Sequence, residues 1–289
     1  MIKFKHILFP VDFSGQCAKA TPFVQAWAAH FGARVSLLNV LEMPPAYYTD
    51  STAFIAAANI EELLQLRKEQ LESFTPKSFR NPDDRRIVTS GIAAMTILDF
   101  VTREGVDLIM MPTRGYGPFR RFLLGSVTAK VLHDCACPVW TGVHAEQPAT
   151  AWSPPDCRSV LCAIDLAPKS AGVIRWAKDL ADSYSAKLVL LHTITGWPES
   201  EPIPQADQFR ALVFDFARKE IEKLQQQAGT NVEVRIVGGE VAHVVHRTAF
   251  ELNSDLVVIG RGVLQEPFGR LRTNAYAIIR ESPCPVLSV

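Results

Sequence analysis

The chain carries one sequence pattern twice. The segment DFSGQCAKATPFVQAWAAHFGARVSLLNVL, which begins at Asp12, aligns without a gap with DLAPKSAGVIRWAKDLADSYSAKLVLLHTI, which begins at Asp165. Later segments containing Asp107 and Asp255 also align, and Cys-Pro-Val closes each copy, at residues 137–139 and 284–286. Identical residues are few, but apolar and polar positions agree. Such a duplication predicts two domains with the same fold.

Each copy alternates short apolar runs with amphipathic segments. Short apolar runs are typical of strands buried on both faces, and repeated strand–helix units predict a parallel sheet with right-handed connections. The expected strands are residues 7–11, 35–41, 87–89, 108–111 and 138–143, then 159–164, 187–193, 232–237, 256–259 and 286–289. The predicted fold class is therefore α/β, with helices flanking the sheet of each copy.

A short segment without periodicity separates the copies. Residues 144–157, HAEQPATAWSPPDC, are rich in Pro and Ala, which is typical of a linker. The predicted domains are residues 1–143 and 158–289. The length of 289 residues agrees with two domains, because about 100–200 residues per domain is usual.

Composition excludes several classes of function. Lys+Arg and Asp+Glu both number 30, so no net charge attracts nucleic acid or an anionic membrane. No apolar run has the length of a signal-peptide core or a membrane span. Six cysteines in so long a chain do not make a disulfide framework. We expect a cytoplasmic protein with reduced thiols, and neither a nucleic-acid nor a membrane partner.

The most specific motifs resemble one known family. The chain contains ILFPVDFS, with Asp12 at a strand end, then DLIMMPTRG, LLGS and the closing CPV. These motifs resemble the universal stress proteins, here in a tandem form that covers nearly the whole chain. The resemblance implies two Rossmann-like domains of the adenine-nucleotide-alpha-hydrolase-like type, each with a five-stranded parallel sheet. Some members of that family bind ATP or AMP, and others have lost the nucleotide.

The resemblance also implies a nucleotide site in the first copy. The family's phosphate motif is Gly-x-x-Gly, nine residues, then Gly-Ser/Thr, and the first copy keeps all of it except the first glycine, which is Pro112. The implied nucleotide-binding residues are Asp12, Val40, Met111, Thr113, Arg114, Gly115, Gly125, Ser126 and Val127. The expected ligand is ATP or AMP, with magnesium accompanying ATP.

Physical chemistry supports a phosphate at this position. Ligands of open parallel sheets bind outside the carboxyl ends of the strands, where Asp12 and the loop after Met111 both lie. Glycine lets the backbone approach a phosphate, and the helix that starts at Ser126 offers unpaired amides. Pro112 removes one N–H, and the loss of one charge-assisted contact costs about 1.5–3 kcal/mol.

The second copy departs further from the motif. Its shortened turn is Gly260-Arg261-Gly262, and the residues before the helix are Arg272-Thr273. Arg272 stands where the motif has glycine, so its side chain is expected to occupy the phosphate volume. These five residues, with Asp165, form a degenerate second site that we expect to be the emptier of the two.

Plainer interpretations stay open for several of these residues. Asp12 and Asp165 can simply cap the turn that follows each strand, and Gly115 and Gly125 can serve as turn and cap residues alone. His133, Cys135 and Cys137 alternate along the chain and could suggest a zinc site. The sequence has no second cysteine pair at the spacing of a structural zinc site, so no metal site is predicted.

The motifs favour binding over catalysis. The chain has no P-loop lysine motif, nucleophile elbow or metal-bound base, so any ATP turnover is expected to be slow. We predict a stress-response protein whose partners are an adenine nucleotide and unidentified proteins. The alternatives are an interaction or small-ligand-binding protein with both sites degenerate, and a relative of the nucleotide-α-hydrolases.

The last strand of each copy is a candidate dimerisation element. The family often dimerises through these strands, and Trp140 and Leu287 occupy matching places in them. The resemblance therefore implies an internal pseudo-dimer, with a homodimer of the whole chain as the alternative.

Overall fold

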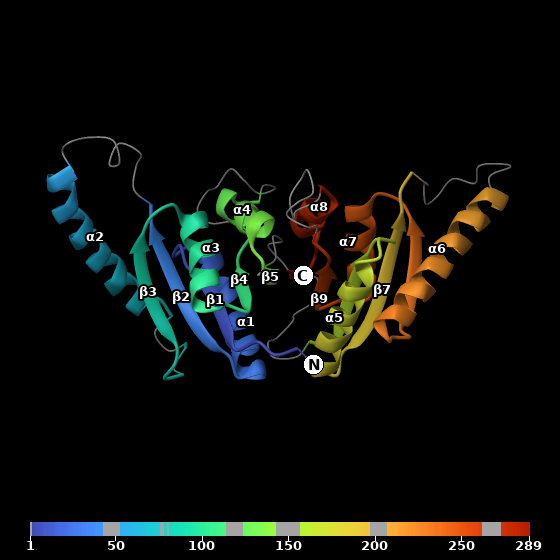
Figure 1. Ribbon diagram of the computed structural model, residues 1–289, viewed down its shortest axis with the longest axis horizontal. Helices are drawn as coiled ribbons and strands as arrows, with labels where there is room; N and C mark the ends of the chain where they lie inside the picture. The colour runs from blue at the N-terminus through green and yellow to red at the C-terminus, as the bar shows by residue number, and fades with distance from the viewer. Residues whose placement is uncertain are drawn as a thin grey trace. The chain divides into compact units, whose positions relative to one another are not determined.

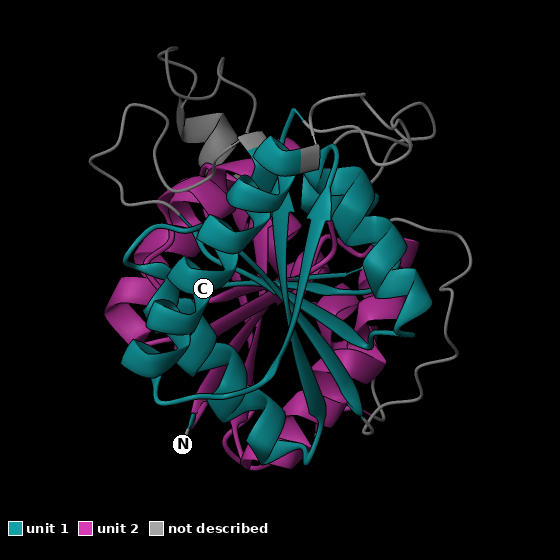
Figure 2. Ribbon diagram, turned by 90° about the vertical axis from the view of Figure 1, so that its right-hand side faces the viewer, with its two compact units in different colours: residues 1–2, 141–289 teal, residues 3–140 magenta. Residues whose placement is uncertain are grey.

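The computed structural model describes residues 2–42, 53–75, 78–79, 81–113, 124–142, 157–196, 207–261 and 273–289. The chain forms two compact units, one of residues 3–140 and the other mainly of residues 141–289 (Figure 2). Each unit corresponds to one copy of the repeat. The predicted linker, residues 144–157, lies almost wholly outside the described residues.

The first copy alternates strands and helices in the predicted order (Figure 1). Its strands are β1 (His6–Pro10), β2 (Arg34–Leu41), β3 (Arg85–Ser90), β4 (Leu108–Met111) and β5 (Val139–Thr141). Its helices are α1 (Gly15–Phe31), α2 (Ala53–Ser73), α3 (Ala93–Glu104) and α4 (Ser126–Asp134).

The second copy repeats this order. Its strands are β6 (Ser159–Ile164), β7 (Lys187–Ile194), β8 (Glu233–Gly238), β9 (Leu256–Ile259) and β10 (Val286–Ser288). Its helices are α5 (Ser170–Ser183), α6 (Asp207–Ala228), α7 (Val241–Glu251) and α8 (Thr273–Glu281). The predicted fold class, two tandem α/β domains of the same type, is confirmed.

The strand order places a ligand-binding edge in each copy. The order is β3-β2-β1-β4-β5 in the first copy and β8-β7-β6-β9-β10 in the second. β1 pairs in parallel with β2 and β4, and β6 pairs in parallel with β7 and β9. The direction of winding therefore reverses between β1 and β4, and between β6 and β9. Ligands of such sheets bind outside the carboxyl ends of the strands at that reversal.

Burial explains why the central strands were readable from the sequence. Every residue of β1, β4 and β9 is buried, and all of them except His6 are apolar, so an apolar run marks each strand. The edge strands β3 and β8 are mostly half-buried, and their ends differ from the predicted ranges by one or two residues. α5 packs beside α6, and α7 beside α8, as expected for helices that cover a sheet in pairs.

The first helix begins earlier than its proline suggests. Proline favours the first turn of a helix, so Pro22 by itself would indicate a helix that starts near this residue. Instead α1 begins at Gly15, where the Ser14 hydroxyl accepts a hydrogen bond from the Cys17 amide and so provides the cap. Pro22 therefore lies inside the helix. The helix ends at Phe31, and Gly32 follows as its C-cap with a left-handed φ of 65°.

None of the described helices combines the length and the apolar character that a membrane crossing needs.

Candidate functional site

The aspartate at the end of the first strand closes a turn in both copies. In the first copy Asp12 Oδ1 accepts hydrogen bonds from the Ser14 amide at 2.9 Å and from the Cys17 thiol at 3.0 Å. In the second, Asp165 Oδ1 accepts from the Ala167 amide at 3.1 Å and from the Ser170 hydroxyl. The capping role left open by the sequence is thus present. Both aspartates are solvent-exposed.

The thiol beside Asp12 is a neutral donor. Burial raises the pKa of Cys17, and the negative charge of Asp12 raises it further. A proton therefore stays on the sulfur at physiological pH, and the thiol can donate to the carboxylate. Both Asp12 and Asp165 thus reach the sheet edge with one oxygen engaged within the protein.

The backbone just after Asp12 is strained. Phe13 has a φ of 63°, in the left-handed region that a bulky residue rarely adopts. Its ring lies 5.9 Å from the ring of Phe74, and the Arg67 guanidinium lies 5.5 Å from its centroid. The equivalent Leu166 has no positive φ. Strain of this kind tends to occur at functional sites.

In the first copy, the two described ends of the loop that was expected to bind phosphate are joined by a hydrogen bond. The Gly125 amide donates to the Thr113 carbonyl at 2.9 Å, and Thr113 is buried. The Thr128 hydroxyl donates to the Pro112 carbonyl at 3.2 Å. The loop thus returns to the end of β4, and α4 starts beside that end.

The start of α4 is the feature that suits an anion. Gly125 is the N-cap residue with an extended backbone, and no side chain caps the helix. Ser126 is exposed and Val127 is half-buried. The first amides of a helix have no partner within the helix, and the dipole there attracts negative charge. Arg114 and Gly115 lie outside the described residues.

Met111 and Val40 take different places in the first copy. Met111 ends β4 and is buried in the core. Val40 lies near the end of β2 and is half-buried, next to Asn39. The Asn39 amide donates to the Val11 carbonyl at 2.8 Å, which ties the ends of β1 and β2 together. Val40 is therefore partly accessible at this edge, whereas Met111 is buried.

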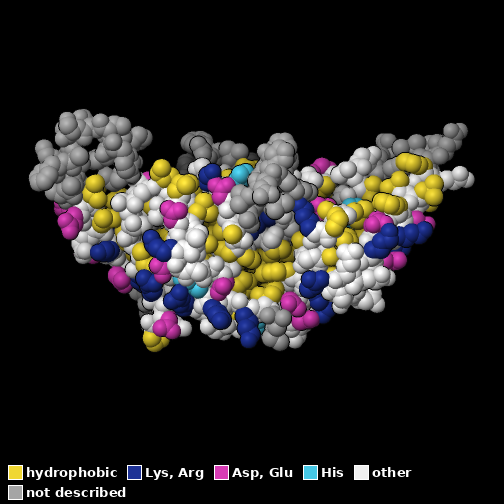
Figure 3. Space-filling model, in the orientation of Figure 1, with side chains coloured by type: hydrophobic (Ala, Val, Ile, Leu, Met, Phe, Trp, Pro, Cys, Tyr) yellow, Lys and Arg dark blue, Asp and Glu magenta, His cyan; other side chains and the backbone are white. Residues whose placement is uncertain are grey.

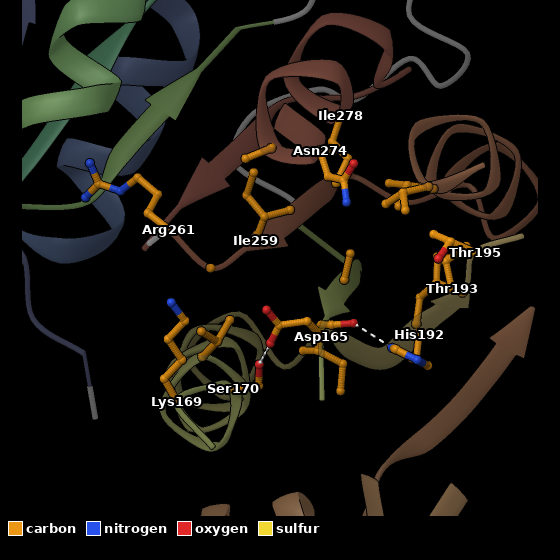
Figure 4. A pocket seen from close by; sticks show the side chains of 18 residues that line it. Asp165, Lys169, Ser170, His192, Thr193, Thr195, Ile259, Arg261, Asn274 and Ile278 are labelled. Carbon is orange, nitrogen blue, oxygen red and sulfur yellow. Dashed lines mark hydrogen bonds between the residues drawn. The ribbon is translucent and has the colours of Figure 1, made fainter. Parts of the chain in front are cut away.

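The second copy contains a cavity at the same edge (Figure 4). Its volume is about 340 Å³, and residues from the ends of β6, β7 and β9 and from α5, α7 and α8 line it. Buried apolar side chains, among them Ile164, Leu191 and Ile259, form much of the wall. Asp165, Gly260 and Arg261 of the predicted second site are among the residues that line this cavity. The sequence had suggested that the phosphate loop of this copy is the emptier of the two.

The polar side chains of the cavity come from separate segments. Asp165 lies at the centre in Figure 4, with Thr193 on one side and Asn274 above it. His192 donates through Nδ1 to the Ile164 carbonyl at 3.0 Å, just as Asn39 donates to Val11 in the first copy. Several of these residues were not singled out from the sequence, namely Lys169, Ser170, His192, Thr193, Thr195 and Asn274.

The repeat itself held a signal for two of them. Aligned on the aspartates, Thr193 occupies the place of Val40. Aligned on the helix starts, Asn274 occupies the place of Val127. Val40 and Val127 are both implied nucleotide contacts in the first copy. Aligning the implied contacts of the first copy with the second copy would therefore have identified Thr193 and Asn274.

The turn after β9 has a structural explanation. A Cβ atom on Gly260 would lie 2.8 Å from Cγ2 of Val173, so glycine is required for the close approach of α5 to this strand. Arg261 lines the cavity and is buried, but its guanidinium points away from the other labelled side chains in Figure 4. Gly262 and Arg272 lie outside the described residues. Thr273 begins α8, and Asn274 follows in its first turn.

Comparison with known proteins identifies the family of both copies. The model of the "Universal stress protein family" matches residues 3–141 and again residues 157–289. A universal stress protein of Thermus aquaticus, encoded in the QAH/OAS sulfhydrylase 3' region, is 31% identical over 139 residues, which cover 47% of this chain and 96% of that protein.

Two solved structures match almost the whole chain. One is a universal stress protein from Archaeoglobus fulgidus, 21% identical, with a TM-score of 0.63 over 99% of this chain and 96% of that one. The other is the functionally unknown PA1789 from Pseudomonas aeruginosa, 18% identical, with a TM-score of 0.64 over 99% and 92%. At these identities the structures establish a shared fold.

Proposed function

The chain belongs to the universal stress protein family, and on that premise we propose that it binds an adenine nucleotide, AMP or ATP, at the carboxyl edge of its sheets. The nucleotide acts as a signal that alters conformation or the choice of protein partner. It is not turned over rapidly, because the sequence holds no catalytic motif for hydrolysis.

The cavity of the second copy is the observation that best supports a ligand at this edge. Its volume of about 340 Å³ falls in the range of about 300–1,000 Å³ that small-molecule sites occupy. Apolar walls suit the faces of a purine ring. Asp165, Thr193 and Asn274 supply the few converging polar groups that orient a ligand, and they suit ribose hydroxyls.

We assign the phosphate-binding site to the first copy. Gly125 precedes α4 without a side chain in the way, and the amides that follow it are available to an anion. In the second copy Arg272 takes the place of this glycine in the sequence. The second cavity is therefore proposed to hold the nucleoside part of a ligand without strong phosphate binding.

Calorimetry of the full chain with AMP and with ATP tests the proposal. Gly125→Arg copies the second-copy residue into the first, and Asn274→Trp fills the second cavity from an exposed position. The expected result is loss of the tighter binding event in Gly125→Arg, whereas Asn274→Trp keeps that event and loses only the weaker binding in the second cavity. Unchanged binding in Gly125→Arg would refute the assignment to the first copy. Absence of binding at millimolar nucleotide would refute the function itself.

A second candidate function is protein docking without a nucleotide. On α6, Phe209, Leu212 and Phe216 are 61%, 67% and 60% exposed, and Figure 3 shows apolar side chains gathered over this helix. They recur at helical spacing, so they form one apolar stripe. This candidate is preferred if neither AMP nor ATP binds while substitution of the stripe by polar residues impairs the stress response.

A further inference from the structure

Two thiols lie close together in the segment that connects α4 and β5. Figure 1 labels these two elements. Cys135 is the C-cap residue of α4, and its amide donates to the Val131 carbonyl at 2.8 Å. Cys137 follows two residues later, and the two sulfur atoms lie 3.4 Å apart. A disulfide bond is about 2.05 Å long, so a sulfur movement of about 1.4 Å would join them.

The second copy provides a natural comparison. The equivalent positions hold Ser282 and Cys284, whose Oγ and Sγ atoms lie 3.9 Å apart. There the Ser282 hydroxyl donates to the Cys284 carbonyl at 2.7 Å, and both side chains are buried. The turn thus contains two thiols in the first copy, and one hydroxyl and one thiol in the second. The turn itself therefore does not require a sulfur atom at the position of Cys135.

Access distinguishes Cys137 from the other five cysteines. Cys17, Cys157, Cys162 and Cys284 are all buried. Burial raises the pKa of Cys157, Cys162 and Cys284 to about 12 and also raises that of Cys17. A thiol must ionise to react, so these four are inert at neutral pH. Cys137 is the half-exposed member of the six, and the neighbouring Cys135 is buried.

We propose that Cys135 and Cys137 are a redox site, which closes to a disulfide when the protein meets a peroxide. The half-exposed Cys137 thiolate attacks one peroxide oxygen, which gives a sulfenic acid at Cys137 and releases hydroxide. The Cys135 sulfur then attacks the Cys137 sulfur, and the sulfenic oxygen leaves as water. In total two thiols lose two electrons and two protons, and one hydrogen peroxide becomes two waters. A small dithiol reverses the change by exchange.

Mass spectrometry of the peroxide-treated full chain tests the proposal. Free thiols are alkylated after treatment, and a protease that cuts after Trp140 separates the pair from Cys157. The expected product is an unalkylated peptide that has lost the mass of two hydrogen atoms and that dithiothreitol restores. A peptide in which both cysteines are alkylated, or in which Cys137 carries two added oxygens while Cys135 is alkylated, would overturn the proposal. So would a stoichiometric zinc ion on the untreated protein, because the thiolates would then be metal ligands.

Two variants keep the test specific. Cys135→Ser copies the second copy, and it is expected to abolish the disulfide and to let Cys137 oxidise to sulfinic acid. Ser282→Cys builds a second dithiol in a buried setting, and this pair is expected to stay reduced while the first pair closes completely. Closure of both pairs at equal rates would show that access does not select Cys137, which contradicts the proposal.

Discussion

Cys17 and Ser170 occupy equivalent positions in the two copies, and each donates a hydrogen bond to Oδ1 of the aspartate that follows the first strand. The same aspartate oxygen also accepts a main-chain amide two residues on, from Ser14 in the first copy and Ala167 in the second. Two different donor groups thus maintain one turn, and the turn places the first helix of each copy beside the ligand-binding edge.

Substitution at Cys17 tests this equivalence. Cys17→Ser replaces a weak donor by a hydroxyl, as in the second copy, and the free energy of unfolding is expected to stay within about 1 kcal/mol of the original. Cys17→Ala removes the donor and is expected to cost about 1–3 kcal/mol. Urea denaturation measures both values. Equal stability of the two variants would show that the contact with Asp12 contributes nothing.

Asp107 and Asp255 hold the start of the first strand in each copy. Asp107 Oδ2 accepts from the amides of Lys5 and His6 at 2.7 and 3.0 Å. Asp255 Oδ2 accepts from the corresponding amides of the second copy at 2.7 and 2.9 Å. Asp107→Ala removes two charge-assisted bonds and is expected to destabilise the first copy by about 2–4 kcal/mol, as seen in urea denaturation.

Asp255→Ala is the matched control for this prediction. Its cost to the second copy is expected to equal that of Asp107→Ala to the first within about 1 kcal/mol, because both carboxylates make the same two bonds. A large cost in one copy and none in the other would contradict the view that the two aspartates are equivalent.

The pH dependence of stability is expected to depend on His6. Burial lowers the pKa of His6 below its ordinary value of 6.5, although the Glu104 carbonyl opposes the shift; the positive charge of Arg34 lowers it further. Below about pH 6.5 His6 is therefore protonated in the unfolded chain more readily than in the folded chain. The free energy of unfolding consequently falls as the pH decreases through that value, and it is regained above it. His6→Gln is expected to flatten this dependence in urea denaturation between about pH 7 and pH 5. A profile unchanged in this variant would assign the dependence to other groups.

The sequence predicted the buried parts of the fold best. The ranges of β4, β6 and β9 agree with the prediction to the residue, because buried strands of a parallel sheet demand nearly uninterrupted apolar runs. Pro22 was misleading for a physical reason. The Ser14 cap and the tertiary contacts of α1 outweigh the one hydrogen bond that a proline removes, so a local preference gave way to packing.

The candidate site was less readable because its residues belong to no single motif. Lys169, His192 and Asn274 come from three separate segments, and each is an ordinary polar residue in its own local sequence. Only the fold brings them around one cavity. Gly260 shows the opposite case: a glycine assigned to the phosphate loop is explained by contact with Val173. A glycine marks a close approach, but the sequence does not say whether a ligand or a helix is the neighbour.

The contact between Gly260 and Val173 also predicts a compensating pair of substitutions. In the first copy the equivalent positions are Pro112 and Ala20, so the larger residue on the strand side is matched by a smaller one on the helix. Gly260→Ala places a Cβ 2.8 Å from Val173 Cγ2, and because a β-branched side chain yields little, the expected cost is about 1–3 kcal/mol.

The double variant with Val173→Ala decides whether this clash is the cause. Truncation of Val173 removes the methyl group that the new Cβ would meet, so the double variant is expected to be more stable than Gly260→Ala alone by about 1 kcal/mol or more. A double-mutant cycle in urea provides the coupling energy. If the two substitutions simply add, the steric explanation is wrong, and Gly260 is then better explained by a backbone role at the ligand-binding edge. Pro112 would in that case interrupt the same role in the first copy, and Pro112→Gly should tighten nucleotide binding there.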